Sequence, residues 1–259
     1  MSSYTRSRIA TGLRVAIEKG GDVSMIYHIV SMLSPRGYYE DLPYPEPTEY
    51  YKTYSTAPRI RLPEPLEASG MDLFEAIRSR RSRRRYSRGS LSLSEVSTLL
   101  YYSLGVTGRA WWGGPKRAYP SAGALQPLEG YLYADKVEGL DNGIYHYNPG
   151  EHSLELLRKG NYSEELQWIA LDQEHVGNAA AVIIVTAVYR RTASKYSHRS
   201  YRYAHWDTGF AGQNIYLVAE ALGLATTAVG AFYDEELCKL LELDCIEEFP
   251  MILFPIGRR

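Results

Sequence analysis

The sequence predicts an α+β fold, and three observations lead to this prediction. Residues 179–189, AAAVIIVTAVY, form a continuous apolar run rich in β-branched residues, which is typical of a central strand covered on both faces. Residues 207–224 have the apolar spacing of a long helix that ends near Gly223. Helical and strand patterns follow each other irregularly, without the regular strand–helix–strand repeat of a doubly wound fold.

The first helix after residue 70 is predicted from its capping signal. Asp72 precedes a segment with helical apolar spacing, and Glu75 follows three residues later, which is the spacing of a capping box. We therefore expect a helix over residues 71–82. Three apolar side chains fall on one face of this helix: Leu73, Phe74 and Ile77.

Two further helices are predicted from their ends. Residues 92–105 form a helix with Ser92 or Ser94 as its N-cap and Gly105 at its end. Asp207 is the expected N-cap of the long helix, because an aspartate side chain accepts hydrogen bonds from the first free backbone amides of a helix.

The remaining elements are predicted from periodicity and turn signals. Residues 130–137 and 143–149 form paired strands around a turn that contains Asp141–Gly143. The last three elements are a strand over 225–232, a helix over 234–243 and a strand over 250–257.

The first seventy residues differ from the rest of the chain. Residues 8–33 form one or two helices, whereas residues 42–70 carry six prolines and many tyrosines. Proline removes amide donors and favours extended chain, so we expect an arm that packs on the body or on a partner subunit. The predicted organisation is an N-terminal helical segment and proline-rich arm over 1–70 and one domain over 71–259.

Composition restricts the classes of function. The formal net charge of −1 gives no general attraction to polyanions, so a nucleic-acid partner is not expected. No apolar run reaches the roughly 18 residues that a membrane span needs, and the N-terminus lacks the apolar region of a signal peptide. Two cysteines, Cys238 and Cys245, are too few for a disulfide framework and lack partners at metal-ligand spacing. We expect a cytoplasmic protein without membrane contact or a metal site.

An arginine-rich run, RSRRSRRRYSR, covers residues 78–88 with seven arginines. Three interpretations compete: a nucleic-acid patch, a solvated helix face, or a pocket for one small phosphorylated ligand. A guanidinium group matches two phosphate oxygens and a serine hydroxyl adds a donor, so four residues could hold a phosphate. They are Arg80, Arg81, Ser82 and Arg84.

A second stretch, residues 117–132, could contact a flat ligand. Pro120 restricts the backbone, and Gly123 with the alanines beside it allows close approach. Ser121 and Gln126 offer polar side chains just before a strand. A plain loop explains these residues as well. The chain has neither the glycine-rich fingerprint of a Rossmann nicotinamide site nor a P-loop.

Several blocks of this sequence resemble the nitroreductase superfamily of FMN-dependent oxidoreductases. Residues 76–86, AIRSRRSRRRY, look like its phosphate-binding motif. Four blocks in order are most similar to its SagB-type branch, which includes azoline (thiazoline or oxazoline) dehydrogenases: residues 119–133, 195–224, 228–237 and 254–259. The resemblance covers about residues 48–259. It implies a mixed central sheet flanked by helices, in an intertwined homodimer with FMN at the interface.

The resemblance also implies roles for individual residues. The FMN phosphate and ribityl chain would be held by Arg80, Arg81, Ser82 and Arg84, with Arg258 adding to phosphate binding, and the other arginines of the run are expected at the surface. The flavin ring would lie along Pro120, Ser121, Gly123 and Gln126, usually of the facing subunit. Backbone at Gly230 and Ala231 would approach the reactive side of the ring.

Lys195 and Tyr196 match a pair that serves the proton side of the reaction in azoline dehydrogenases. The alternative is that their segment packs at the dimer interface. The leading prediction is therefore an FMN-dependent dehydrogenase of a small-molecule or peptide-borne heterocycle. A reductase of nitroaromatics or quinones, with NAD(P)H as transient co-substrate, is the alternative, and a non-enzymatic FMN- or phosphoanion-binding protein is a more remote one.

Overall fold

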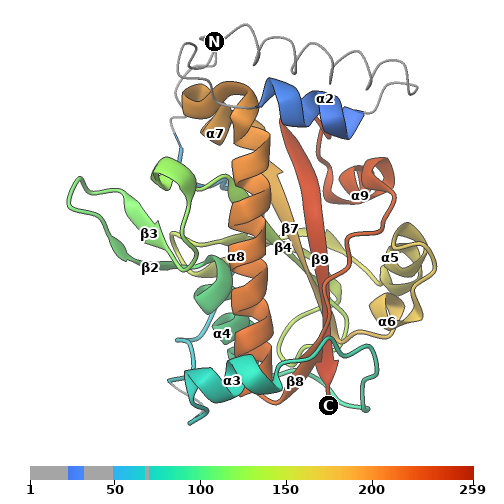
Figure 1. Cartoon of the computed structure of the whole chain (residues 1–259). Coiled ribbons are helices and arrows are strands. Elements are labelled where there is room, and N and C mark those ends of the chain that lie inside the picture. The colour runs from blue at the N-terminus through green and yellow to red at the C-terminus, as the bar shows by residue number, and fades with distance from the viewer. Residues whose placement is uncertain (1–22, 32–48, 68–69) are drawn as a thin grey trace, which may run out of the picture.

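The computed structural model describes residues 23–31, 49–67 and 70–259. A seven-stranded sheet forms its centre, in the order β1-β6-β5-β4-β7-β9-β8 (Figure 1). Each pairing between these strands is antiparallel, and one isolated parallel bridge joins Leu91 to Val137. The strands are β1 Arg59–Arg61, β4 Leu128–Ala134, β5 Gly143–Asn148, β6 Ser153–Lys159, β7 Ala181–Val188, β8 Leu224–Thr226 and β9 Glu248–Arg258.

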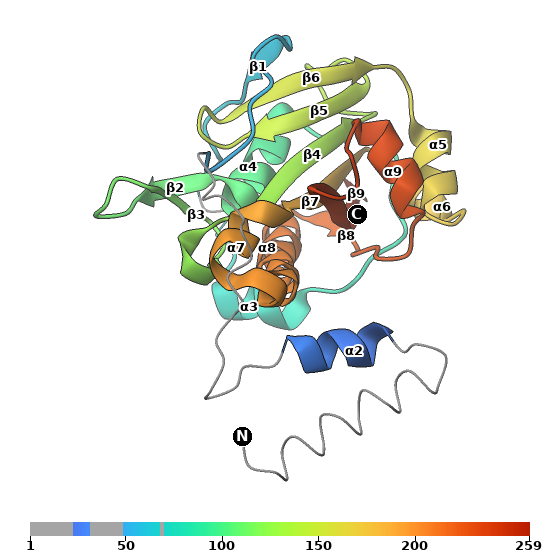
Figure 2. The same ribbon diagram turned by 90° about the horizontal axis from the view of Figure 1, so that it is seen from above.

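Helices cover both faces of the sheet, which confirms the predicted α+β class (Figure 2). One apolar core lies between the sheet and α4 Leu93–Leu104 and α8 Ser200–Ala221. The second core lies between the sheet and three shorter helices, α5 Ser163–Ile169, α6 Glu174–Gly177 and α9 Asp234–Leu241. The remaining elements are α2 Val23–Val30, α3 Leu73–Ser79, α7 Tyr189–Tyr196 and a two-stranded hairpin of β2 Val106–Arg109 and β3 Pro115–Arg117.

Strand β7 confirms the prediction of a central strand covered on both faces. It pairs with β4 on one side and β9 on the other. Ile183 and Val185 belong to the first core, whereas Val182 and Ile184 belong to the second. Alternate residues of a strand point to opposite faces, so a strand covered on both faces is apolar at every position.

The helix caps that were predicted from residues close in sequence are confirmed for α3 and α4. Asp72 accepts hydrogen bonds from the amides of Phe74 and Glu75 at the start of α3. Ser92 and Glu95 form a complete capping box at the start of α4, and Gly105 is its C-cap.

The long helix α8 corrects the prediction for Asp207. The helix begins at Ser200, not after Asp207, so Asp207 lies in the interior of the helix and not at its N-cap. Gly212 lies where α8 crosses β9, and a Cβ atom there would be 2.8 Å from Phe254 Cζ. The helix therefore packs close to the sheet and holds Asp207 in a buried position.

The arm between residues 49 and 67 packs on the body. Strand β1 pairs with β6 at the edge of the sheet. The amides of Lys52 and Tyr54 donate to the buried carboxylates of Glu129 and Glu155. The predicted helices over 8–33 lie outside the described residues except for α2, and the division at residue 70 stays a prediction.

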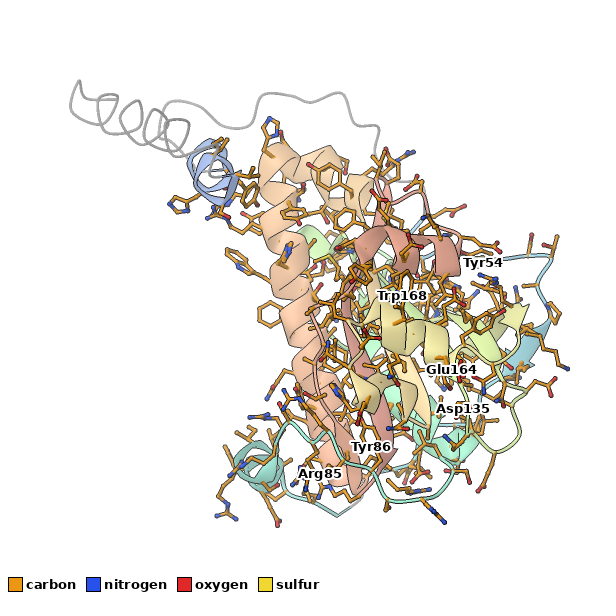
Figure 3. The ribbon with its side chains drawn as sticks, turned by 90° about the vertical axis from the view of Figure 1, so that its right-hand side faces the viewer. Tyr54, Arg85, Tyr86, Asp135, Glu164 and Trp168 are labelled. Carbon is orange, nitrogen blue, oxygen red and sulfur yellow. A yellow bond between two sulfur atoms is a disulfide. The ribbon has the colours of Figure 1, made fainter. Side chains whose placement is uncertain are left out.

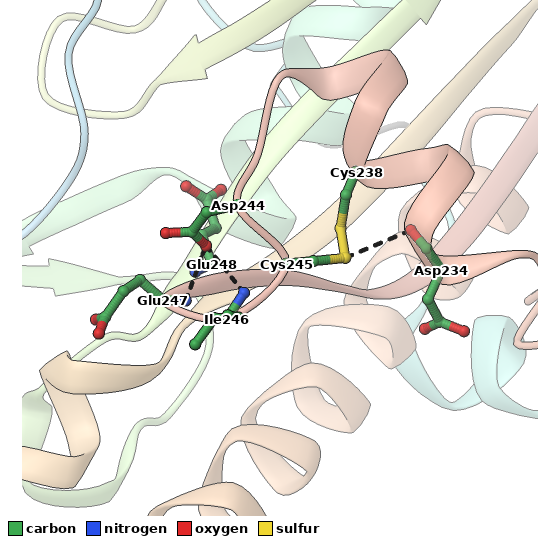
Figure 4. Close-up of a disulfide and its surroundings, with 7 residues drawn as sticks. All are labelled: Asp234, Cys238, Asp244, Cys245, Ile246, Glu247 and Glu248. Carbon is green, nitrogen blue, oxygen red and sulfur yellow. Dashed lines mark hydrogen bonds between the residues drawn. A yellow bond between two sulfur atoms is a disulfide. The ribbon is translucent and has the colours of Figure 1, made fainter.

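The two cysteines, too few for a disulfide framework, nevertheless bond to each other. Cys238 of α9 and Cys245 of the following loop form a disulfide with an S–S distance of 2.03 Å (Figure 4). Beside it, Asp244 accepts hydrogen bonds from the amides of Ile246, Glu247 and Glu248. The disulfide and Asp244 together fix the turn between α9 and β9.

None of the helices in the described part of the chain is long and apolar enough to cross a membrane. The same residues contain no group of three or more histidine, cysteine, aspartate or glutamate side chains that could hold a metal ion.

Candidate active site

Arg80 and Ser82, two of the predicted phosphate residues, meet at Tyr216 of α8. The Arg80 guanidinium lies over the Tyr216 ring, 5.1 Å from its centroid. The Ser82 hydroxyl is 2.8 Å from the Tyr216 hydroxyl, which also accepts a hydrogen bond from the amide of Ala228. Tyr216 therefore joins the arginine run to the loop that leads to Gly230.

The other arginines of the run point in different directions. Arg81 bonds to the carbonyls of Arg78 and Arg80 at the surface. Arg83 departs from the expected surface role, because it forms an ion pair of 2.7 Å with the buried carboxylate of Glu220. The run therefore supplies both exposed guanidinium groups and a structural anchor to α8.

Arg84 lines a basic cavity of about 950 Å³, and Tyr216 is not among the residues that line it. Arg85 and Tyr86 line this cavity and lie toward the end of the molecule opposite Tyr54 (Figure 3). Arg258 lines it too, but both of its terminal nitrogens bond to Glu95, at 2.6 and 2.8 Å. Glu95 neutralises that guanidinium and would compete with a phosphate for it. The phosphate role of Arg258 therefore stays a prediction.

The loop over residues 120–126 has an uncommon backbone conformation. Gly123, Ala124 and Gln126 all have positive φ angles, of 61°, 56° and 50°. The Ser121 hydroxyl accepts a hydrogen bond from the Gln126 amide at 2.9 Å. Residues other than glycine rarely adopt this region, so contacts around the loop must hold it in place.

Gln126 points into the protein, whereas Pro120 is exposed. The Gln126 side chain is 3% exposed, and its amide nitrogen donates to the carbonyl of Pro115. Its side-chain oxygen Oε1 is buried without a hydrogen-bond partner among the described residues.

Lys195 and Tyr196, the predicted catalytic pair, lie against Gly123. A Cβ atom at Gly123 would be 2.7 Å from Tyr196 Oη and 3.3 Å from Lys195 Nζ. A side chain at residue 123 would therefore displace the end of the Tyr196 side chain, and the positive φ of Gly123 also favours glycine there. The end of α7 and the 120–126 loop, distant in sequence, therefore form one site.

Asp207 completes this site and was missed as a candidate by the sequence analysis. Ser121 and Ala122 of the 120–126 loop are the groups that lower the pKa of its carboxyl. The side chain is 2% exposed, and its Oδ2 atom has no partner in the part of the chain described here. Burial raises the pKa of Asp207 to about 6, against the lowering effect of Ser121 and Ala122.

The backbone at Gly230 and Ala231 is exposed, as a close approach to a ligand requires. A Cβ atom at Gly230 would meet open space. Among the described residues, neither amide donates to a protein acceptor, whereas the Ala231 carbonyl accepts from Gln173 at 3.2 Å. Two neighbouring amide donors are thus available beside Ala228 and Tyr216.

A family model described as the nitroreductase family matches residues 77–258. The nitroreductase-like protein MJ1384 of Methanocaldococcus jannaschii is 38% identical over 200 residues, which cover 77% of this chain and 96% of that protein. The microcin B17-processing protein McbC of Escherichia coli is 30% identical over 146 residues, 54% of each chain.

Solved structures with a similar fold are known as well. A nitroreductase-like protein from Anabaena variabilis is 25% identical, with a TM-score of 0.73 over 92% of this chain. This chain spans 47% of that protein. These matches confirm the resemblance that the ordered sequence blocks predict.

Proposed function

Because this chain belongs to the nitroreductase family of oxidoreductases, we propose that it is an FMN-dependent dehydrogenase of thiazoline or oxazoline rings, carried by a small molecule or a peptide. The contact of Gly123 with Lys195 and Tyr196 is the observation that supports this proposal most directly. It joins the loop expected beside a flavin ring to the pair expected to take a proton. The similarity to a microcin B17-processing protein supports this substrate class.

The residues at the arginine run suit an FMN phosphate. Arg80 and Ser82 present a guanidinium and a hydroxyl, and no carboxylate is paired with either group in the described structure. Donors of this type match phosphate oxygens. Arg84 is exposed and would contribute a further charge.

The residues around Gly123 and Gly230 suit a flat ring. Gly230 leaves space that a side chain would fill, Gly123 lies against Lys195 and Tyr196, and the amides of Gly230 and Ala231 are free to donate. When bound, FMN would accept a hydride from the substrate. Lys195 or Tyr196, acting as a base, would take the proton released from the neighbouring ring atom. The heterocycle would thus lose one hydride and one proton and become aromatic.

A second copy of the chain is part of this proposal. Asp207 beside the loop and Tyr216 beside the arginine run are nine residues apart on α8, about 13.5 Å along the helix axis. The apolar face predicted for α3 is exposed, and so are three large side chains of α8. These exposed residues are Leu73, Phe74, Ile77, Tyr201, Trp206 and Phe210. An apolar face of this kind supports a homodimer that brings the loop of one subunit to the arginines of the other.

The visible spectrum of the freshly purified protein tests this proposal. We expect a flavin spectrum that anaerobic NADPH leaves unchanged and that a synthetic thiazoline-containing peptide bleaches, with loss of two hydrogens from the peptide in its mass spectrum. Rapid bleaching by NADPH, without oxidation of the peptide, would favour a reductase of nitroaromatics or quinones. Absence of flavin, with no retention of added FMN, would contradict both.

The phosphate assignment has its own test. Arg80→Ala combined with Arg84→Ala should weaken FMN binding about 100-fold, because each charged hydrogen bond contributes about 1.5 kcal/mol or more. Arg78→Ala combined with Arg88→Ala removes the same charge from the same run and should leave FMN binding within about threefold. Equal losses in the two double variants, measured by fluorescence titration with FMN, would contradict the assignment.

A further inference from the structure

We propose that Cys238 and Cys245 are a redox modification site: a dithiol reductant opens their disulfide, releases the turn over residues 242–247 and thereby loosens the start of α7. The effect on catalysis rests on the proposed function, because α7 carries Lys195 and Tyr196 at its other end. The opening of the disulfide and the release of the turn do not rest on it.

The opening reaction is an exchange between thiols and a disulfide. Cys238 is 2% exposed, whereas Cys245 is only half-buried, so a reductant reaches the Cys245 sulfur first. A thiolate of the reductant bonds to that sulfur, the Cys238–Cys245 bond breaks, and Cys238 leaves as a thiolate that takes up a proton. The second thiol of the reductant then displaces Cys245 from the mixed disulfide. The protein gains two electrons and two protons, and the dithiol becomes a disulfide.

The turn needs the disulfide because part of its backbone is unfavourable (Figure 4). Glu242 and Cys245 have positive φ angles of 57° and 63°, which cost energy in residues that carry a side chain. Asp244 binds the amides of residues 246–248, beyond Cys245. Among the described residues, neither the amide nor the carbonyl of Cys245 forms a hydrogen bond. The disulfide therefore holds this residue in place.

The short spacing of the two cysteines favours a redox role over a purely structural one. They are 7 positions apart in the sequence, so their disulfide closes a small loop. A cross-link excludes fewer unfolded conformations when its loop is short, and it stabilises the fold less than one across a long loop. A half-buried cysteine in such a bond remains open to attack by a thiol.

The same turn holds the start of α7. The amide of Tyr189 donates to the Glu247 carbonyl at 2.8 Å, and Arg190 forms an ion pair of 2.9 Å with the Glu247 carboxylate. A cavity of about 460 Å³ lies between the turn and this end of the helix, with Arg190, Asp244 and Glu247 among its lining residues. The cavity gives the turn room to move when the disulfide opens.

Helix α7 connects the turn to the candidate catalytic pair. It is eight residues long, which is about 12 Å, and its far end lies against Gly123. The ion pair of Arg191 with Glu129, at 2.5 Å, does not involve the turn. Without the Glu247 contacts, α7 pivots about Arg191, and the end that carries Lys195 shifts against Gly123.

The state of the thiols in the full-length protein is the first measurement. Alkylation of the unfolded chain, followed by its mass, should show no free thiol in the purified protein and two after treatment of the folded protein with dithiothreitol. A disulfide that is absent from the purified protein would overturn the proposal. So would one that resists dithiothreitol until the protein unfolds.

Amide hydrogen exchange is the second measurement. We expect reduction to speed exchange about tenfold over residues 243–248 and about threefold or more over residues 189–196, with residues 93–104 of α4 unchanged. Cys238→Ala combined with Cys245→Ala is the matched control, because it should exchange at the reduced rate with or without dithiothreitol. Cys245→Ala alone serves if the double variant does not fold. Equal rates in the oxidised and reduced natural protein would overturn the proposal.

Anaerobic bleaching of bound FMN by the thiazoline-containing peptide is the third measurement, made after dithiothreitol has been removed. Reduction should slow bleaching about threefold or more, with FMN content unchanged, because a misplaced base takes the proton less readily. Equal bleaching rates in the two forms would overturn the effect on the pair. Faster exchange after reduction in a protein that binds no FMN would support the redox site while the proposed function fails.

Discussion

Glu129 and Asp207 are both buried carboxylates, but their pKa values shift in opposite directions. Glu129, on β4, is 0% exposed, and Asp207, on α8, is 2% exposed. Burial alone raises the pKa of each, yet the pKa of Glu129 falls to about 2 while that of Asp207 rises to about 6. Both side chains are almost fully buried, so the number and charge of their partners explain the difference between their pKa values.

Glu129 belongs to a network in which every charge has a partner. It forms an ion pair of 2.5 Å with Arg191 and accepts from His146 at 3.2 Å and from the Lys52 amide at 2.7 Å. His146 also bonds to Glu155 at 2.9 Å. Burial lowers the pKa of His146, but the two carboxylates raise it beyond that effect, so the histidine is stabilised in its charged form.

Asp207 has only two neutral donors and no cation among the partners that shift its pKa. The two carboxylates therefore differ in kind: Glu129 belongs to an ion-pair network that joins β4, β5 and the arm, whereas Asp207 is buried on α8 without a charged partner among the groups that shift its pKa. A buried acid without a charged partner is a candidate for a functional role.

The largest expected effect comes from breaking the network. Glu129→Ala leaves the guanidinium of Arg191 buried without its carboxylate, so we expect the free energy of unfolding to fall by about 3–5 kcal/mol. Urea denaturation at pH 7 measures this loss. Glu151→Ala is the control, because Glu151 forms an exposed ion pair with Arg59, and it should cost less than about 1 kcal/mol. Losses of similar size would contradict the distinction between the two kinds of pair.

The second expected effect is acid destabilisation through Glu129. Its pKa is about 2 in the folded chain against 4.5 for an ordinary glutamate. A folded pKa below the unfolded one stabilises the protein above pH 4.5, and this stabilisation, about 3 kcal/mol, is lost as the pH falls toward 2. Denaturation curves between pH 6 and pH 2.5 should therefore show a steeper loss in the natural protein than in Glu129→Gln. Parallel curves would show that Glu129 does not carry this dependence.

Only part of the fold, and only part of these two regions, could be predicted from the sequence. The caps at Asp72 and Ser92 follow from residues three positions apart, so local spacing predicts them correctly. The start of α8 was misplaced because Asp207 has the chemistry of a cap, while the preceding residues continue the helix to Ser200. The sequence signal that could have identified Asp207 as a site residue was a charged residue on the buried side of a long helix.

The pairing of distant segments required the structure. The resemblance predicted the 120–126 loop and the Lys195–Tyr196 pair separately, but their contact depends on how α7 packs beside Gly123. The network of Glu129, His146 and Glu155 depends on the register of three strands, in which His146 is opposite both Tyr131 and Glu155. No spacing within one segment indicates such a register.

The third expected effect, close in size to the second, is a gain in stability at Asp207. Its pKa is about 6 when folded against 3.8 for an ordinary aspartate, so ionisation of this group destabilises the fold. That cost is absent below pH 3.8, grows between pH 3.8 and pH 6, and reaches about 3 kcal/mol above pH 6. Asp207→Asn keeps the shape and cannot ionise, so it should unfold at higher urea concentration than the natural protein at pH 7.5 and at the same concentration at pH 3.5.

Asp72→Asn is the matched control for this last prediction, because asparagine caps a helix about as well as aspartate and Asp72 is exposed. It should change stability by less than about 0.5 kcal/mol at either pH. A gain at pH 7.5 in Asp207→Asn alone would identify Asp207 as a residue kept despite its cost to stability, in contrast to Glu129. A loss of stability in Asp207→Asn at pH 7.5 would mean that the ionised carboxylate is as well satisfied as Glu129, and the contrast between the two regions would disappear.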